Sequence, residues 1–197
     1  MKKRTMALLA AMLLIVGVVI GSTLAWLTAK TETVTNTFTT SDINIELTET
    51  KGTKTDDTHY SFKMTPGYTI EKDPEVTVKA GSEACFLFVK LDEENNFGNY
   101  MTYTVDTSKW KLLEGSSNIY YQKVDATDVD KPFEILKGNV VTVKDTVTKE
   151  MMNSLNASNY PKLKITAYAS QLYKNSDKQE FSAAEAWANV TNPLPSN

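Results

Sequence analysis

The sequence predicts an all-β protein: a jelly-roll-like β-sandwich with one or two short helices, preceded by a helical signal peptide. Apolar residues alternate with polar ones in many short runs, which is the period of a half-buried strand. Turn-forming residues separate these runs at regular intervals. The long uncharged apolar run stands at the N-terminus, behind basic residues. About eight to ten short strands result, the number expected of a sandwich or jelly roll.

Residues 1–25 have the parts of a secretory signal peptide. The basic residues 2–4 precede an uncharged apolar run over residues 6–20, and small residues follow. Signal peptidases accept small side chains at the third and first positions before the cut. Thr23 and Ala25 meet this requirement, so we expect cleavage before Trp26.

An uncleaved membrane anchor is the alternative for this segment. Residues 6–27 are uncharged, and a spanning helix needs about 20 apolar residues. Under either interpretation the basic end stays in the cytoplasm and the rest of the chain is exported. The membrane is then contacted through the N-terminal segment alone, before any cleavage.

Composition limits the function classes. The chain of 197 residues has a formal charge of −3, and the predicted signal peptide carries three basic residues and no acidic one. Residues 26–197 therefore hold 18 basic and 24 acidic side chains, which excludes a basic surface for nucleic acid. Their number suits one domain with a full core. The single cysteine, Cys85, cannot form an intramolecular disulfide, and its apolar surroundings predict a small buried hydrophobe.

Residues 26–40 form an extended segment ahead of the domain at 41–197. Seven threonines lie between positions 28 and 40, and their branched Cβ atoms favour extended backbone. Val34 and Phe38 share one face of such a strand, with Asn36 between them. The segment has too few apolar groups to fold alone, but it has two anchors for a groove.

The first half of the domain contains three clear patterns. Ile43, Ile45 and Leu47 alternate with polar residues and predict a half-buried strand. The same alternation predicts strands over residues 60–64 and 76–78. The run from Cys85 to Leu91 is apolar almost throughout and predicts a central strand covered on both faces.

The second half predicts further strands and two short helices. Residues 100–105 and 119–124 bracket a turn at 115–118 and predict a hairpin, whose first arm runs through Trp110 and Leu112. Residues 133–136 and 140–143 flank a turn at 137–139, and residues 163–169 alternate as a last strand. Thr148 is the expected cap of a helix that ends near Leu155. Ser182 and Glu185 form a capping box at the start of another helix.

The N-terminal half resembles the TasA and camelysin family of secreted proteins, whose members carry a SipW-type signal peptide. The likeness is strong over residues 1–47, moderate to about residue 91 and weak beyond. It is carried by Gly-Ser-Thr-Leu-Ala-Trp-Leu-Thr at 21–28, by Val34, Asn36, Thr37 and Phe38, by Ile-Asn-Ile-Glu-Leu at 43–47, by residues 64–76 with Pro-Gly and Lys-Asp, and by Ala-Gly-Ser at 80–82.

The resemblance implies export through a dedicated signal peptidase, a jelly-roll domain and a place in extracellular biofilm fibres. Fibres of this family are thought to grow by donor-strand exchange, in which the mature N-terminal strand of one subunit completes the sheet of the next. The chain's partners would then be other copies of itself, head to tail, and other matrix proteins. Pairing of residues 26–40 within their own subunit, or their use as a disordered tether, is the alternative. Val34 and Phe38 would be the donor-strand anchors, because an added strand gains backbone hydrogen bonds while side-chain pockets fix its register.

Enzymatic and metal-binding alternatives have weaker support in the sequence. Camelysin has been described as a metalloprotease, but a zinc protease needs two or three histidines, typically in His-Glu-x-x-His, and this chain has His59 alone. Asp125, Asp128 and Asp130 with residues 56–57 offer oxygen ligands for weak calcium binding, but they match no EF-hand loop. We therefore expect a non-enzymatic protein without catalytic, cofactor or metal residues. A monomeric surface-displayed binding domain on an uncleaved anchor stays open.

Overall fold

The structure, a computed structural model, describes residues 42–56 and 58–191. The predicted signal peptide and the extended segment lie outside these residues. The same holds for the residues expected to act there, which are Thr23, Ala25 and Trp26 at the cleavage site and the anchors Val34 and Phe38.

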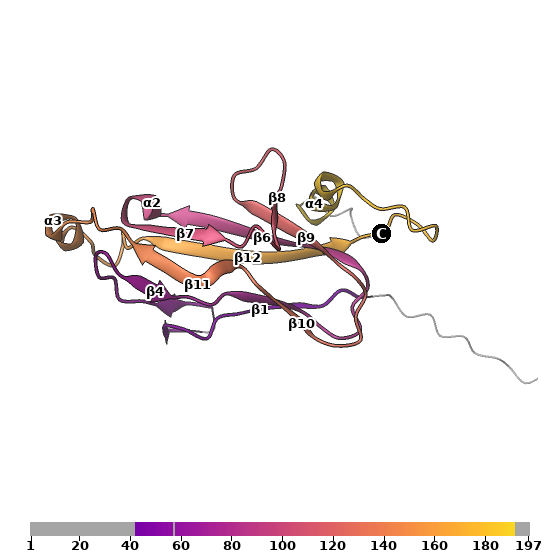
Figure 1. The fold of residues 1–197 in the computed structure, drawn as a ribbon, viewed down its shortest axis with the longest axis horizontal. Helices are drawn as coiled ribbons and strands as arrows, with labels where there is room; N and C mark the ends of the chain where they lie inside the picture. The colour runs from indigo at the N-terminus through magenta and orange to yellow at the C-terminus, as the bar shows by residue number, and fades with distance from the viewer. Residues whose placement is uncertain (1–41, 57, 192–197) are drawn as a thin grey trace, which may run out of the picture. The chain divides into compact units, whose positions relative to one another are not determined.

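Six strands make the first layer of the fold (Figure 1). The orders are β1-β5-β10 and β4-β11-β7, and every pair is antiparallel. Three residues separate β4 from β5 and one separates β10 from β11, so the two three-stranded sheets continue each other. The strands are β1 (Ile45–Thr48), β4 (Thr69–Glu71), β5 (Glu75–Val78), β7 (Met101–Val105), β10 (Lys131–Glu134) and β11 (Leu136–Val143).

The second layer is a four-stranded antiparallel sheet in the order β12-β6-β9-β8. The strands are β6 (Cys85–Glu94), β8 (Lys111–Leu112), β9 (Ile119–Val124) and β12 (Lys162–Gln171). β6 lies between β12 and β9, as expected for an apolar central strand. A separate two-stranded hairpin joins β2 (Thr53–Lys54) to β3 (Tyr60–Ser61).

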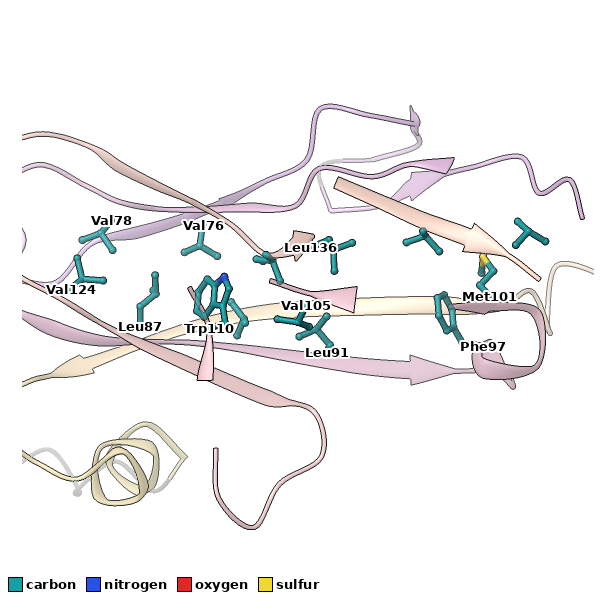
Figure 2. Packing of buried hydrophobic residues seen from close by; sticks show 14 of the residues in the cluster. Val76, Val78, Leu87, Leu91, Phe97, Met101, Val105, Trp110, Val124 and Leu136 are labelled. Carbon is teal, nitrogen blue, oxygen red and sulfur yellow. The ribbon is translucent and has the colours of Figure 1, made fainter. Parts of the chain in front are cut away.

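The main core lies between the layers, because alternate residues of facing strands point inward. Val76 of β5 and Leu87 of β6 are fully buried there. Figure 2 shows Trp110 among these side chains. Its indole Nε1 donates to the carbonyl oxygen of Glu134 at 2.8 Å, which satisfies the polar atom of a residue that is 1% exposed.

Three short helices complete the described residues: α2 (Phe97–Tyr100), α3 (Lys149–Asn153) and α4 (Ala183–Thr191). α4 covers the outer face of the second layer, where Trp187 packs 5.3 Å from the Phe88 ring and 5.1 Å from the Tyr168 ring, centroid to centroid. The Ser182 and Glu185 capping box is present, and the Thr148 hydroxyl accepts from the Met151 amide.

The prediction of an all-β sandwich is confirmed, and four details of it are wrong. Residues 101–105 are not in the hairpin with residues 119–124: β7 pairs with β11, and β8 alone is the partner of β9 in that hairpin. α2 was not predicted. The expected turn at residues 137–139 is a bulge inside β11, where the pairing with β7 shifts between Leu136 and Val141. The predicted strand over residues 60–64 stops at Ser61, and the ring of the next residue, Phe62, packs on Gly52.

The strand order is that of an incomplete jelly roll. In the first layer, β4 and β5 together take the place of one strand, and so do β10 and β11, which gives the order β4/β5, β10/β11, β7. In the second layer the order is β12, β6, β9. Both orders follow the jelly-roll pattern, which is built from two Greek keys. In an eight-stranded jelly roll the first strand pairs with the last one. Here β1 pairs with β5 instead, so the first-strand place beside β12 is not taken by any described strand.

Candidate functional site

The outer edge of β12 is the most unusual feature of the described fold. On one side β12 pairs with β6 over all ten residues, from Lys162 opposite Glu94 to Gln171 opposite Cys85. On the other side no strand from residues 42–56 or 58–191 pairs with it. Ten residues of strand present about 33 Å of edge. Such an edge is a template for another strand.

A groove lies where β12 approaches β1, the edge strand of the other layer. β1 runs antiparallel to β5, and its Leu47 side chain is 39% exposed. The groove has a volume of about 270 Å³. Its lining comes from β1 and the residue after it, the β2–β3 hairpin, the β4–β5 connection and the start of β12: Leu47, Thr48, Glu49, Thr58, Tyr60, Lys72, Pro74, Leu163 and Ile165.

The apolar part of the groove follows from strand alternation. Leu163 and Ile165 point toward the core and line the groove, while the residues between them point to the other face. On that face Lys164 forms an exposed ion pair with Glu94 at 3.2 Å. At residues 163–165 the edge thus combines an apolar inner face with a charged outer face. This pattern is typical of a strand that is covered on one face and exposed to solvent on the other.

A nearly buried ion pair makes the polar part of the groove. Lys72 Nζ lies 2.6 Å from Glu49 Oε2, and the side chains of Glu49 and Lys72 are only 8% and 15% exposed. The backbone amide of Asp73 donates to Glu49 Oε1 at 2.8 Å. Lys72 also lies over the Phe62 ring, 5.1 Å from its centroid. These contacts hold the end of β1 to the connection between β4 and β5.

Burial changes the ionisation of the carboxyl groups at this pair. Burial of Glu49 raises its pKa, and the Asp73 side chain acts in the same direction, while Lys72 and the backbone amide of Asp73 oppose both. Burial also acts to raise the pKa of Asp73. Hydrogen bonds with Glu49, Thr50 and Lys51 outweigh it, and they hold the pKa of Asp73 well below its usual range. Water is therefore already scarce around Glu49 before anything covers the groove.

The described residues weighed for metal binding or catalysis do not line this groove, although His59 stands between Thr58 and Tyr60, which do. The His59 ring is exposed, with Nδ1 2.8 Å from Asp56 Oδ1. Asp130 binds Lys79 at 2.5 Å and accepts from the Ala80 amide. Within the described residues, no group of three or more His, Cys, Asp or Glu side chains could hold a metal ion.

Sequence reasoning identified the strand at residues 163–169 and expected a groove for residues 26–40, but it did not identify the residues that line the groove. Alternation shows which face of a strand is buried, but it does not show which of its edges is paired. Glu49 and Lys72 stand 23 positions apart, and the sequence around each of them predicts an ordinary exposed charge. The extended segment at residues 26–40, ahead of β1, was the available signal for a strand that is added to the sheet from outside the domain.

Comparisons with known proteins add no relative to this picture. No family model matches the chain, and searches of curated proteins and of solved structures found no match. Among the described residues, no helix has the length and apolar character to cross a membrane. What the groove binds therefore has to be inferred from its own geometry and from the sequence.

Proposed function

We propose that this protein is a secreted structural subunit of extracellular matrix fibres, with no enzymatic activity of its own. In a fibre, residues 26–40 of one copy pair with the outer edge of β12 in the next copy and cover the groove beside it. The observation that carries the proposal is the ten-residue edge of β12, which pairs with no strand of the described residues and stands where a jelly roll has its first strand.

The N-terminal segment has the length and composition of the missing strand. It is 15 residues long, which is enough for a strand matching all of β12 with some residues left as a connection. Its threonines favour extended backbone. Val34 and Phe38 fall on one face and would meet the apolar side chains Leu163 and Ile165 and the exposed Leu47.

Pairing between copies produces a chain of subunits. The described part of the chain starts beside residues 79–83, where the Lys79 amide donates to the carbonyl oxygen of Asn44 and the Glu83 amide to that of Asp42. The groove lies at the other end of β1, next to Leu47 and Glu49. Donor and acceptor are thus different surfaces, and a contact between different surfaces propagates instead of closing into a dimer.

The resemblance to the TasA and camelysin family supports the location in this proposal. The signal-like residues 1–25 would direct export, and cleavage after Ala25 would free Trp26 as the new N-terminus. Until cleavage, the donor segment stays attached to the apolar leader, and cleavage frees its end.

A pair of substitutions in the donor segment tests the proposal. In the mature chain, residues 26–197, Phe38→Asp should abolish fibres at every concentration, because it brings an unpaired charge against an apolar groove. Thr37→Asp is the matched control, since residue 37 faces the opposite side of the strand and the charge stays in water. Negative-stain microscopy at rising protein concentration is the measurement. Equal assembly of the two variants would contradict donor-strand pairing.

Deletion and N-terminal mapping separate the remaining alternatives. Removal of residues 26–40 should leave folded monomers that do not elongate, and fibres from that chain would rule the proposal out. Mass spectrometry of the exported protein should give Trp26 as the first residue. An intact N-terminus would favour the anchored monomeric binding domain instead.

A further inference from the structure

The Glu49–Lys72 pair gives the groove a feature that a plain apolar channel lacks. Both side chains line the groove together with Leu47, Leu163 and Ile165. A donor strand laid over them removes the remaining water from two opposite charges. Covering an ion pair with apolar groups is costly unless further hydrogen bonds are supplied. The occupant is therefore expected to carry a polar side chain at this point of the strand.

The donor segment carries one such side chain on its groove-facing side. Val34, Asn36 and Phe38 share a face, and each step of two residues spans about 6.6 Å along a strand. Asn36 is thus an amide between two apolar anchors. An amide both donates and accepts, so it can donate to the Glu49 carboxylate and accept from the Lys72 ammonium at the same time.

Building on the proposed function, we infer that Asn36 sets the register of the donor strand by binding the Glu49–Lys72 pair of the neighbouring copy. In this register Val34 and Phe38 contact the apolar surfaces on either side of the pair. A shift by two residues places Val34 or Phe38 on the charges, and a shift by one turns all three side chains away from the groove. The occupant is the N-terminal segment of a second copy, recognised through an apolar–amide–apolar pattern.

The free capacity of the pair agrees with this assignment. Glu49 Oε2 accepts from Lys72 and Oε1 accepts from the Asp73 amide, and the Asp73 side chain is a further partner of the carboxyl group, so at least one lone pair stays open to a donor. Lys72 has three N–H groups, of which one is used on Glu49. One amide can therefore be added without breaking any contact of the pair.

Peptide inhibition of fibre growth tests the inference on the whole mature chain. Synthetic peptides of residues 26–40, with the natural sequence or with Asn36→Leu, are added to growing fibres of residues 26–197, and elongation is followed by light scattering. The natural peptide should block growth at a concentration about tenfold or more below the Asn36→Leu peptide, since hydrogen bonds to charged groups are lost. Equal potency of the two peptides would overturn the register assignment and leave donor-strand pairing standing.

Variants of the acceptor complete the design. In Glu49→Met/Lys72→Met chains the preference, that is, the stronger inhibition by the natural peptide than by the Asn36→Leu peptide, should disappear or reverse, because an apolar groove offers the amide no hydrogen-bond partner. The matched control is Glu94→Gln/Lys164→Met, which removes an exposed pair on the other face of the sheet and should keep the full preference. If thermal melting shows that the double methionine variant is unfolded, Glu49→Gln alone should still shrink the preference. A failure of both peptides to inhibit the natural chain would overturn the proposed function together with this inference.

Discussion

Trp110 fills the space between the layers and also ties the segment before β8 to β10. Replacing it with phenylalanine removes the 2.8 Å hydrogen bond to the Glu134 carbonyl and leaves unfilled volume in the core. We expect Trp110→Phe to lower the free energy of unfolding by about 2–4 kcal/mol. Urea unfolding measures the loss. Trp187→Phe, at a partly buried ring on α4, is the comparison and should cost less; the opposite ranking would place the main core elsewhere.

Cys85 should be chemically silent in the folded protein. It is fully buried at the start of β6, and burial raises the pKa of its thiol to about 11. At pH 8 the reactive thiolate is scarce and iodoacetamide has no path to it. We expect no alkylation of the native protein under conditions that modify the chain completely in 6 M guanidinium, as measured by intact mass. Fast native labelling would mean that the β6 region opens.

Prediction from sequence works at the residue scale where one property decides the outcome. The apolar run at Cys85 predicts a fully buried strand, and the serine and glutamate at 182 and 185 predict a cap, because each depends on local chemistry. Glu49 and Lys72 were not identified, since their burial depends on a contact between two distant segments. Nothing in either segment distinguishes these charges from solvated ones.

At the scale of elements, the cap of α4 gives a pH-dependent contribution to stability. Glu185 accepts from Lys174 Nζ at 2.8 Å and from the Ser182 amide at 2.8 Å. These bonds, with Lys174 the larger effect, lower the pKa of Glu185 from 4.5 to about 2. The carboxylate therefore favours the folded state above pH 4.5, and this contribution is lost as the pH falls from 4.5 toward 2.

Replacement of Glu185 by glutamine should remove the contribution to stability that is lost between pH 4.5 and pH 2. We expect Glu185→Gln to melt below the natural chain at pH 7, with the difference vanishing near pH 2 and shrinking at high salt, because the site is exposed. Differential scanning calorimetry at pH 7, 4 and 2 is the measurement. Ser182→Ala removes the acceptor of the Glu185 amide at a cost of about 1 kcal/mol, and most of this cost should remain at pH 2, because the amide loses its partner whether or not the carboxyl group is charged. A constant difference for both variants would refute the electrostatic origin.

The bulge in β11 shows why element boundaries were harder to predict than element types. Lys137, Gly138 and Asn139 have the composition of a turn, and Gly138 and Asn139 do adopt positive φ values of 72° and 53°. The chain nevertheless continues in the same direction, because β4 and β7 pair with β11 beyond the bulge. Local chemistry predicts the unusual backbone correctly, and long-range pairing decides that the strand does not reverse.

At the scale of the whole described domain, the edge strands on the two sides of the sandwich differ in length. On the side of β7 and β8 the edge strands are short and Trp110 lies close by, in the core. On the side of β1 and β12 a long edge stays without a partner among residues 42–56 and 58–191. Natural sheets normally shield such an edge. The outward charges of β12 give partial shielding, and its apolar inner face still favours an added strand.

Head-to-tail pairing makes a prediction that no symmetric contact shares. Phe38→Asp removes the donor, and Ile165→Asp should remove the acceptor by placing a charge in the apolar wall of the groove. Each variant alone should stay monomeric. Mixed in equal amounts, they should form a heterodimer and nothing longer. The intact donor of the Ile165→Asp chain binds the intact acceptor of the Phe38→Asp chain, and the two surfaces left at the ends are the substituted ones, which cannot bind.

Light scattering coupled to gel filtration measures the mass of the mixture. Thr166→Asp, on the opposite face of β12, is the matched control and should form fibres as the natural chain does. Fibres from the mixture would mean that at least one substitution leaves its surface active. A mixture that stays monomeric, with both variants folded by circular dichroism, would contradict pairing of residues 26–40 with the β12 edge. A heterodimer requires that donor and acceptor be separate surfaces on one chain. The same property lets each natural chain bind one neighbour through its donor and another through its acceptor, so that a fibre can grow.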